Sequence, residues 1–252
     1  MDKVKIFEEL LNEFETEEVR AYCEDMIQLI PDYIFLIPSS TSMKYHNKTQ
    51  CQTHGQIYHI IMFGTIMNYI LGLKYVRENI ATTPMQRDCL RCTPIFHDAL
   101  KCGVDGNVNS YSVFEHPLLA GQWIRDTVVE HDLPMEVKEF IADLCESHSG
   151  EWTTSKKSSK VLPEPKTDAA FLVHLADYLS SRANLDMIYS IEFLELLGDY
   201  SPVLPDIREY KLTFGKFAGK SLPEIKKLNP GYIDWLKENY GKEPVRSLLK
   251  QL

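Results

Sequence analysis

The chain has 252 residues, of which 44% are hydrophobic and 25% charged, a composition typical of a globular protein with a substantial core. The charged, amphipathic segment 1–16 lacks the apolar centre of a signal peptide, and no apolar run approaches the roughly 18 residues of a membrane span. A membrane protein is therefore excluded, and we expect a cytoplasmic protein. The six cysteines are scattered along a long chain, so we expect reduced thiols rather than a disulfide framework.

The net charge of −9 is distributed unevenly. Residues 207–252 contain ten Lys or Arg against five Asp or Glu, a net charge of +5, which leaves −14 on the preceding 206 residues. Such an asymmetry predicts two units with different partners. We therefore expect a first domain over residues 1–198 and a small basic module over 207–252, separated by the Pro-containing segment 199–205.

Apolar residues at helical spacing predict that the first domain is all-α. The expected helices, in chain order, cover residues 2–14, 17–29, 56–74, 85–97, 111–130, 134–148, 167–182 and 190–197. Before residue 200, Tyr33 to Ile37 is the one stretch that looks like a strand. The polar loop 39–46 follows it, and its hydroxyls together with Lys44 could bind an anion, although a plain surface turn fits the composition equally well.

The basic module has the pattern of an α+β unit. Tyr210 to Phe214 alternates as a short strand, and a turn over 215–219 precedes the expected helices, which cover 221–227, 231–239 and 243–252. Ser221 and Glu224 have the spacing of a capping box, which marks the start of the first of these helices. The predicted fold class is therefore mostly α, with an all-α body and a small C-terminal α+β module.

Residues of metal-ligand type recur along the expected helices. His97 and Asp98 are adjacent, and they offer a nitrogen ligand and a carboxylate whose second oxygen can reach a neighbouring ion. A single His on an apolar helix is more often a hydrogen-bonded core residue, because a buried polar group needs one partner and not a metal. The pattern His, His-Asp, His, His, Asp favours a metal site instead. It is formed by His59, His97, Asp98, His116, His148 and Asp177.

The motifs around these residues resemble the HD-domain superfamily of metal-dependent phosphohydrolases, over roughly residues 38–182. His97-Asp98-Ala99-Leu100-Lys101-Cys102-Gly103 fits the H-D-x-x-K-x-G of that superfamily. Gly55-Gln56-Ile57-Tyr58-His59 resembles its G-G-L-x-x-H opening, with Gln56 in place of the second glycine. Ser147-His148-Ser149-Gly150-Glu151 is similar to the S-H-H-G-E segment of HD-containing 3′–5′ exoribonucleases, and a proline-rich segment there also leads into a helix carrying an aspartate.

The resemblance implies a site for two divalent first-row metal ions, iron or manganese before others. One ion would be bound by His59, His97, Asp98 and Asp177. Asp98 would bridge to a second ion held by His116 and His148, and the pair would activate a water and clamp phosphoryl oxygens. Lys101 would neutralise phosphate charge or hold Asp98, which makes Asp98 and Lys101 the expected catalytic residues. The alternative for Lys101 is a solvated lysine at a helix end.

Four further residues are candidates for substrate contact: Lys44, His46, His54 and Arg182. His54 also competes with His59 for the role of first ligand, but the G-x-I-x-H context and the long helix that follows favour His59. For His46 and His54 a structural role fits as well as substrate contact. Arg182 could approach phosphates, as could the loop lysines at 156, 157 and 160, although a solvated loop is the simpler interpretation for the lysines.

The start of the basic module resembles a small domain with the pattern F-G-K-y-k-G followed by Y-l-x-W, which occurs at the C-termini of some DNA exonucleases and in phage-encoded proteins. The matching residues are Phe214-Gly215-Lys216-Phe217-Ala218-Gly219 and Tyr232-Ile233-Asp234-Trp235, with Ala218 in place of the usual basic residue. Lysines beside aromatic rings suit a phosphate backbone and stacked bases, so single-stranded nucleic acid is a candidate partner. The alternative is that Phe214, Tyr232 and Trp235 form the core of so small a unit.

Together these features predict a metal-dependent phosphohydrolase or phosphodiesterase that hydrolyses a phosphoester of a nucleotide or of a nucleic-acid 3′ end. Two alternatives remain. The first is an HD-type nucleoside mono- or triphosphatase, in which the basic module serves dimerisation or regulation. The second is a non-catalytic, metal-stabilised nucleic-acid-binding protein, which the lysine of the H-D-x-x-K motif disfavours because a structural metal site needs no phosphate partner.

Overall fold

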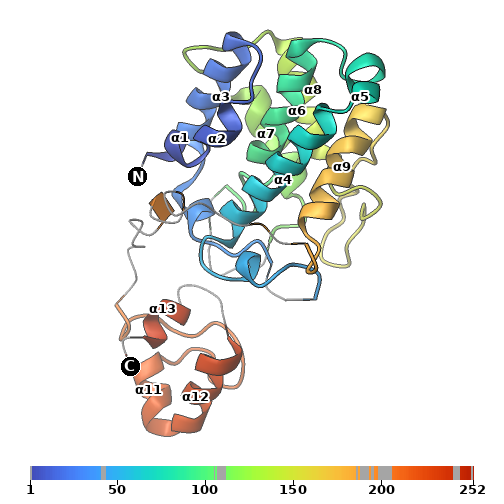
Figure 1. Ribbon diagram of the computed structural model, residues 1–252. Helices are drawn as coiled ribbons and strands as arrows, with labels where there is room; N and C mark the ends of the chain where they lie inside the picture. Colours follow the sequence, from blue (N-terminus) through green and yellow to red (C-terminus); the bar gives the residue numbers. More distant parts are fainter. Residues whose placement is uncertain are drawn as a thin grey trace.

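The computed structural model describes residues 2–40, 44–104, 106, 112–185, 187, 193, 196–197, 206–240, 245–250 and 252. Within these ranges the regular structure is helical, with no sheet and a single isolated antiparallel bridge between Lys211 and Ser221 (Figure 1). Among the described helices, none combines the length and the apolar character that crossing a membrane requires. The predicted all-α character of the body is confirmed for the part of the chain that is described.

The elements follow one another in this order: α1 (Lys3–Ile6), α2 (Glu8–Leu11), α3 (Glu17–Leu29), the 3₁₀ helices η1 (Asp32–Phe35) and η2 (Thr49–Cys51), α4 (Gly55–Leu71), α5 (Lys74–Asn79), α6 (Pro84–Phe96), α7 (His116–Asp126), α8 (Met135–Glu146), α9 (Asp168–Ser180), α11 (Leu222–Leu228), α12 (Pro230–Asn239) and α13 (Val245–Leu249). The predicted helices 17–29, 85–97, 134–148 and 167–182 correspond to α3, α6, α8 and α9 within two residues at each end.

Other predicted bounds differ from the structure. The helix expected over 2–14 is divided at Phe7 into α1 and α2, and the helix expected over 56–74 ends at Leu71, before a turn at Gly72. The helix expected over 111–130 begins at His116, because Pro117 is tolerated in the first turn of a helix and not in its interior. The expected helix 190–197 falls mostly outside the described residues, and the expected linker 199–205 lies wholly outside them.

Both strand predictions are corrected. Tyr33 to Ile37 forms most of η1 and the turn after it, and Tyr33, Ile34 and Phe35 are all buried. A short buried helical turn and a buried strand both produce a continuous apolar run, so the sequence pattern does not distinguish them. The strand predicted over 210–214 reduces to the Lys211–Ser221 bridge. In its described residues the C-terminal module is thus helical and not α+β.

The body is built around α4, which contacts α6 on one side and α9 on the other. Figure 1 shows these helices beside α7 and α8, with α1 to α3 (blue) on the flank of α6. Every residue of α4 from Gly55 to Gly64 is buried, which explains the mostly apolar sequence of this stretch. His59 lies within this buried stretch, so α4 carries a polar side chain into the centre of the body.

The N-terminal helices are fixed to α6 by a network of charged side chains. Asp88, fully buried, accepts hydrogen bonds from the backbone N–H groups of Glu15 and Thr16 and from the Thr16 hydroxyl, so it caps the start of α3 from another helix. Arg87 binds the Glu15 carboxylate through two nitrogens at 2.7 and 2.6 Å, and Arg91 adds a contact of 3.1 Å. The network holds α6, the helix that ends beside His97.

The helices α11, α12 and α13 enclose an apolar cluster of their own. Its buried members are Tyr210, Leu212, Leu222, Ile225, Ile233, Leu236, Val245, Leu248 and Leu249. The capping box at the start of α11 is confirmed, since the Ser221 N–H donates to Glu224 Oε2 at 2.7 Å. This separate cluster fits a division of the chain near residue 200, which remains a prediction.

Candidate metal centre

The structure brings together the six residues predicted as metal ligands, from helices α4, α6, α7, α8 and α9. His59 lies on α4 and Asp177 on α9. His97 is the C-cap of α6 and Asp98 follows it, while His116 is the first residue of α7. His148 comes two residues after the end of α8. Helix ends supply most of the set, because the chain can turn there and direct a side chain between neighbouring helices.

The polar atoms of these residues lie within contact distance of one another. The Nε2 atom of His59 is 3.0 Å from Asp177 Oδ1, and Nε2 of His97 is 3.2 Å from Asp98 Oδ2. Nε2 of His116 is 2.8 Å from Asp98 Oδ1. Two groups could each hold a metal ion, with ligand atoms within 4.8 Å of one another. They are His59 with His97 and Asp177, and His97 with Asp98 and His148.

Backbone contacts orient three of the imidazoles in the same way. The Nδ1 atoms of His97, His116 and His148 lie 2.9, 2.6 and 2.7 Å from carbonyl oxygens three residues earlier in the chain, those of Pro94, Val113 and Cys145. A carbonyl can only accept, so each Nδ1 carries a hydrogen, and in the neutral form of each imidazole Nε2 presents a lone pair to the cluster. Metal-binding histidines are usually held by this kind of second contact.

Lone pairs in such proximity need a cation between them. Nε2 of His59 and Nε2 of His97 are 3.2 Å apart. Asp98 Oδ1 is buried without a hydrogen bond, although Nε2 of His116 is 2.8 Å away. An acceptor facing another acceptor is unfavourable in a buried site unless a proton or a metal ion lies between them. The nitrogen and carboxylate donors therefore fit a first-row divalent ion.

The pKa shifts of four ligands favour the protonation states that a metal needs, whereas His97 is an exception: burial would lower its pKa, but the neighbouring Asp98 raises it. Burial lowers the pKa of His59, and it lowers that of His148 to about 3, so both imidazoles are neutral at pH 7. Burial alone would raise the pKa of Asp98, but the nearby Lys101, His97 and His116 hold it well below its usual range. The His59 contact likewise keeps the pKa of Asp177 low against the effect of burial. Neutral imidazoles and ionised carboxylates are the forms that coordinate metal.

Lys101 faces the cluster and not solvent. Its Nζ atom lies 2.5 Å from Asp98 Oδ2, and the residue is 9% exposed. Tyr33 fixes the turn that carries it, because the Tyr33 hydroxyl accepts from the Cys102 N–H at 3.3 Å and donates to the Gly103 carbonyl at 3.1 Å. Gly103 has φ +83°, a conformation that glycine adopts without strain. A lysine is thus held at the ligand cluster by contacts with η1.

The candidate substrate residues differ in their surroundings. The His46 ring centre is 5.8 Å from that of His59, and burial lowers the pKa of His46 to about 4. Lys44 lies at the surface with its Nζ over the ring of Tyr45, and the guanidinium of Arg182 lies over the same ring. His54 is the N-cap of α4, and its Nδ1 contacts the Phe35 carbonyl. These contacts favour a structural role for His54.

Two residues beside the ligands have no counterpart in the predicted set. Gln56 is fully buried and donates from Nε2 to Asp98 Oδ2 at 3.0 Å. Ser180 Oγ lies 3.1 Å from Nδ1 of His59 and donates to the Asp177 carbonyl, which links α9 to α4 at the cluster. The departure from a second glycine at Gln56 was visible in the sequence. Its contact with Asp98 depends on how α4 packs on α6.

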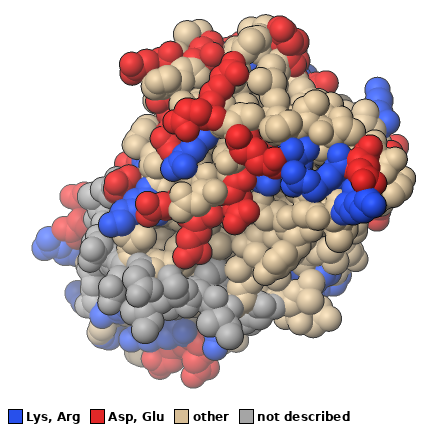
Figure 2. All heavy atoms as spheres, turned by 45° about the horizontal axis from the view of Figure 1, so that its top comes forward, with Lys and Arg blue, Asp and Glu red and all other residues tan. Residues whose placement is uncertain are grey.

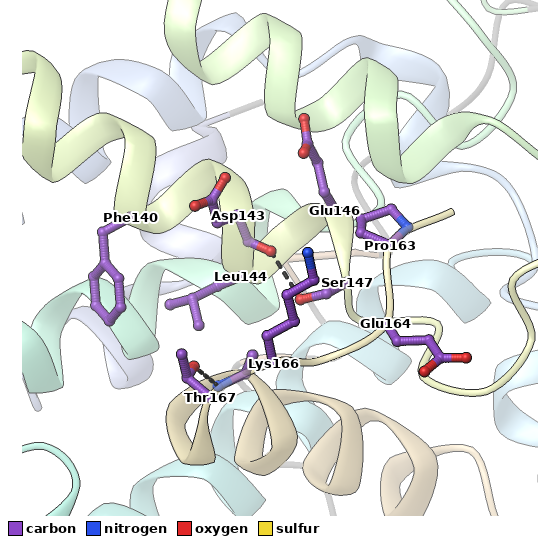
Figure 3. A pocket seen from close by; sticks show the side chains of 10 residues that line it. Phe140, Asp143, Leu144, Glu146, Ser147, Pro163, Glu164, Lys166 and Thr167 are labelled. Atoms are coloured by element: carbon purple, nitrogen blue, oxygen red, sulfur yellow. Dashed lines mark hydrogen bonds between the residues drawn. The ribbon is translucent and has the colours of Figure 1, made fainter. Parts of the chain in front are cut away.

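A pocket of about 220 Å³ lies beside this cluster but is not formed by it (Figure 3). It is lined by Phe140, Asp143, Leu144, Glu146, Ser147, Pro163, Glu164, Lys166, Thr167 and Ala170. None of the six ligand residues is among them. Ser147, which precedes His148, donates to the Asp143 carbonyl at 2.8 Å, so its hydroxyl is engaged within α8. The pocket therefore does not extend the candidate metal centre.

The comparisons with known proteins concern the C-terminal module. Residues 212–240 match the family model described as exodeoxyribonuclease X-like C-terminal. The match covers α11 and α12 and confirms the resemblance of this stretch to a nuclease-associated module. The search of curated proteins and the search of solved structures found no match. The resemblance of residues 38–182 to the HD superfamily stays a prediction.

Proposed function

We propose that the protein is a metal-dependent phosphohydrolase of the HD type that hydrolyses a phosphoester of a nucleotide or of a nucleic-acid 3′ end. One observation carries the proposal. Imidazole nitrogens with their hydrogens committed elsewhere converge with two ionised carboxylates, and a buried lysine lies beside them. Iron or manganese would suit this mixture of nitrogen and carboxylate ligands. The proposal assigns His59, His97, Asp98, His116, His148 and Asp177 to the metal and Asp98 and Lys101 to catalysis.

Bound divalent ions would supply Lewis-acid chemistry, polarising a water and neutralising phosphoryl oxygens. The protein's own residues prepare the site for that task. Lys101 and Gln56 hold Oδ2 of Asp98, which leaves Oδ1 directed toward His116. In this proposal the positive charge of Lys101, beside Asp98, would also compensate the charge that builds up on a phosphoester as phosphorus is attacked. His46, whose ring centre lies 5.8 Å from that of His59, is a proposed substrate contact beside the cluster.

The C-terminal module supports a nucleic-acid substrate. Its resemblance is to the C-terminal part of an exodeoxyribonuclease, and its net charge is +5. The Tyr232 and Trp235 rings are stacked with centres 5.6 Å apart, and Trp235 is 48% exposed. Lys216 Nζ lies 5.6 Å from the Tyr232 ring centre. A half-exposed aromatic pair with a neighbouring lysine is suited to single-stranded nucleic acid, so Trp235 is not simply core.

The body offers a contrasting surface. Figure 2 shows Asp and Glu side chains spread over one face, with Lys and Arg side chains between them. Among the described residues on that face there is no continuous basic surface for a phosphate backbone. We therefore propose that the body, residues 1–198, carries the chemistry and that the module, residues 207–252, holds the strand. The nucleoside mono- or triphosphatase alternative leaves the exposed aromatic pair unused, and the non-catalytic alternative leaves the buried Lys101 unused.

Metal analysis combined with a substrate screen tests the proposal. The purified protein should hold one or two first-row ions per chain, and in manganese it should hydrolyse a generic phosphodiester or a labelled single strand. Asp98→Asn preserves the size of the side chain but removes its charge, so turnover should fall by about a thousandfold or more. Asp126→Asn, on the surface of α7, is the matched control and should behave as wild type.

The outcomes separate the candidate functions. Hydrolysis of nucleoside mono- or triphosphates without action on strands would favour the phosphatase alternative. Bound metal without any hydrolysis would favour the non-catalytic binding protein. Protein that takes up no first-row ion would refute the proposal itself.

A further inference from the structure

A stack of aromatic rings and one guanidinium runs along the outer side of α9. The rings of Trp152 and Tyr178 are nearly parallel, with an angle of 10° and centres 5.9 Å apart. The guanidinium carbon of Arg182 lies 3.9 Å from the centre of the Tyr178 ring and 5.4 Å from that of Tyr45. Tyr45, Arg182, Tyr178 and Trp152 thus form one continuous stack, from three segments that are far apart in the sequence.

Two segments of the stack also carry a residue of the candidate metal centre, and the third carries His46, whose ring lies beside that of His59. Tyr178 follows Asp177 directly, and Tyr45 precedes His46, whose ring lies 5.8 Å from that of His59. Trp152 belongs to the segment that contains His148. The stack is therefore built from the same chain segments as the ligands His148 and Asp177 and the neighbouring His46.

His174 joins the stack to the cluster directly. Its Nδ1 lies 2.9 Å from the His148 carbonyl, and its ring is 5.8 Å from that of Trp152. Because a carbonyl only accepts, Nδ1 of His174 donates, and the backbone of His148 is fixed to α9. Gly150 makes this approach possible, since a side chain there would overlap the His174 ring.

The stack is not part of the hydrophobic core. Trp152 is 52% exposed, Tyr45 50% and Tyr178 36%, and none of the three belongs to the buried clusters of the body. Arg182 rigidifies the arrangement because its guanidinium packs between the rings of Tyr45 and Tyr178. Such cation–π interactions become stronger when the charged group is shielded from water. Large, ordered, half-exposed aromatic faces beside a polar site are the surfaces on which nucleobases stack.

We infer that the Trp152–Tyr178 stack binds the base of the substrate. The inference rests on the proposed function, in which the substrate is a nucleotide or a nucleic-acid end, and it deepens that function by naming the surface that binds the base. The free face of the Trp152 ring receives the base while the phosphate lies toward Lys101 and the ligands. Arg182 acts in this arrangement by holding Tyr178 in place, and not as a direct phosphate contact.

The test uses two ligands that differ only in the base. A methylenephosphonate analogue of adenosine monophosphate resists hydrolysis, and the same compound without adenine keeps the sugar and the phosphonate. Their dissociation constants are measured by isothermal titration calorimetry on the full-length protein as purified with its metal. The variants are Trp152→Ala, Trp152→Phe and, as the matched control, Tyr75→Ala, since Tyr75 on α5 is an exposed aromatic residue of the same kind, 67% exposed.

Loss of one stacked base is expected to weaken binding of the adenine-bearing ligand roughly tenfold in Trp152→Ala. Trp152→Phe should stay within about threefold of wild type because it keeps an aromatic face, and Tyr75→Ala should be unchanged. The base-free ligand should bind all four proteins equally. Since Trp152 is half exposed, the thermal midpoint of Trp152→Ala should stay close to that of wild type.

Equal affinity of wild type and Trp152→Ala for the adenine-bearing ligand would overturn the inference. So would an equal loss for both ligands, or wild-type protein that fails to distinguish them. Turnover of phosphoesters is measured separately on the same preparations. Hydrolysis without base-dependent binding would support the proposed function and refute this inference. Base-dependent binding without hydrolysis would support the base-binding surface and refute the proposed hydrolytic function.

Discussion

Gln56 donates a hydrogen bond of 3.0 Å to the Oδ2 atom of Asp98, the same oxygen that Lys101 contacts at 2.5 Å. Both groups are buried, and the Oε1 atom of Gln56 has no hydrogen-bond partner among the described residues. Asp98 is therefore restrained on one oxygen and left open on the other. Without the Gln56 amide, Oδ2 would keep its contacts with Lys101 at 2.5 Å and with Nε2 of His97 at 3.2 Å.

Removing this restraint should weaken the metal centre. Gln56→Ala should lower metal affinity or turnover by about tenfold, because contacts that orient a ligand typically contribute that much. The measurement is the dissociation constant of manganese, together with kcat on the preferred phosphoester. Gln122→Ala, which removes an amide from the exposed surface of α7, is the control. Unchanged manganese affinity and kcat in Gln56→Ala would show that Asp98 is oriented without Gln56.

The Glu15 network makes stability depend on acid pH. Hydrogen bonds from Arg87, with Arg91 adding to them, lower the pKa of Glu15 from 4.5 to about 2 in the folded protein. As the pH falls, the unfolded chain takes up the proton first, so the stabilisation is complete above about pH 4.5 and is lost as the pH falls toward about 2. Glu15→Gln should therefore reduce the free energy of unfolding by about 1–3 kcal/mol at pH 7 and by much less near pH 3.

Urea unfolding at several pH values measures this difference. Glu24→Gln provides the comparison, because the Arg20–Glu24 pair lies on the surface of α3 with both side chains 35% exposed. That exposed pair should contribute less than about 1 kcal/mol at any pH. If Glu15→Gln reduces the free energy of unfolding equally at pH 7 and at pH 3, the destabilisation does not arise from the ion pairs of Glu15 with Arg87 and Arg91.

The C-terminal module should bind single strands through Trp235 and Lys216. Trp235→Ala should lower the affinity for a labelled oligonucleotide several-fold at all salt concentrations, because stacking on a base is insensitive to salt. Lys216→Ala should instead reduce the salt dependence, since a phosphate contact releases counterions. Fluorescence anisotropy over a range of salt concentrations distinguishes the two.

Leu236→Ala tests whether the fold of the module matters for the same binding. Leu236 is fully buried in the cluster of α11 to α13, so its truncation should destabilise the module by about 2–5 kcal/mol. Affinity that survives both Trp235→Ala and Lys216→Ala would assign strand binding to another surface.

The helices of the body were predictable because their apolar patterns are long and regular. Each of α3, α6, α8 and α9 begins or ends near a capping residue or a proline, as Thr83 and Pro84 show for α6. The short stretch Tyr33 to Ile37 was not predictable, because a buried 3₁₀ turn and a buried strand have the same apolar composition. The strand predicted over 210–214 was wrong because a strand needs a partner along its length. In the described residues this stretch pairs through a single bridge, between Lys211 and Ser221.

The order and type of the candidate ligands could be predicted from the chain alone, because helix ends and a motif of adjacent residues are local features. The folded structure was needed to find which nitrogen of each imidazole faces the cluster, that Gln56 reaches Asp98, and that Tyr45, Arg182, Tyr178 and Trp152 form one stack. Most of these contacts join residues that are far apart in the chain. Their distances depend on how α4, α6, α8 and α9 pack, and no local pattern encodes that packing.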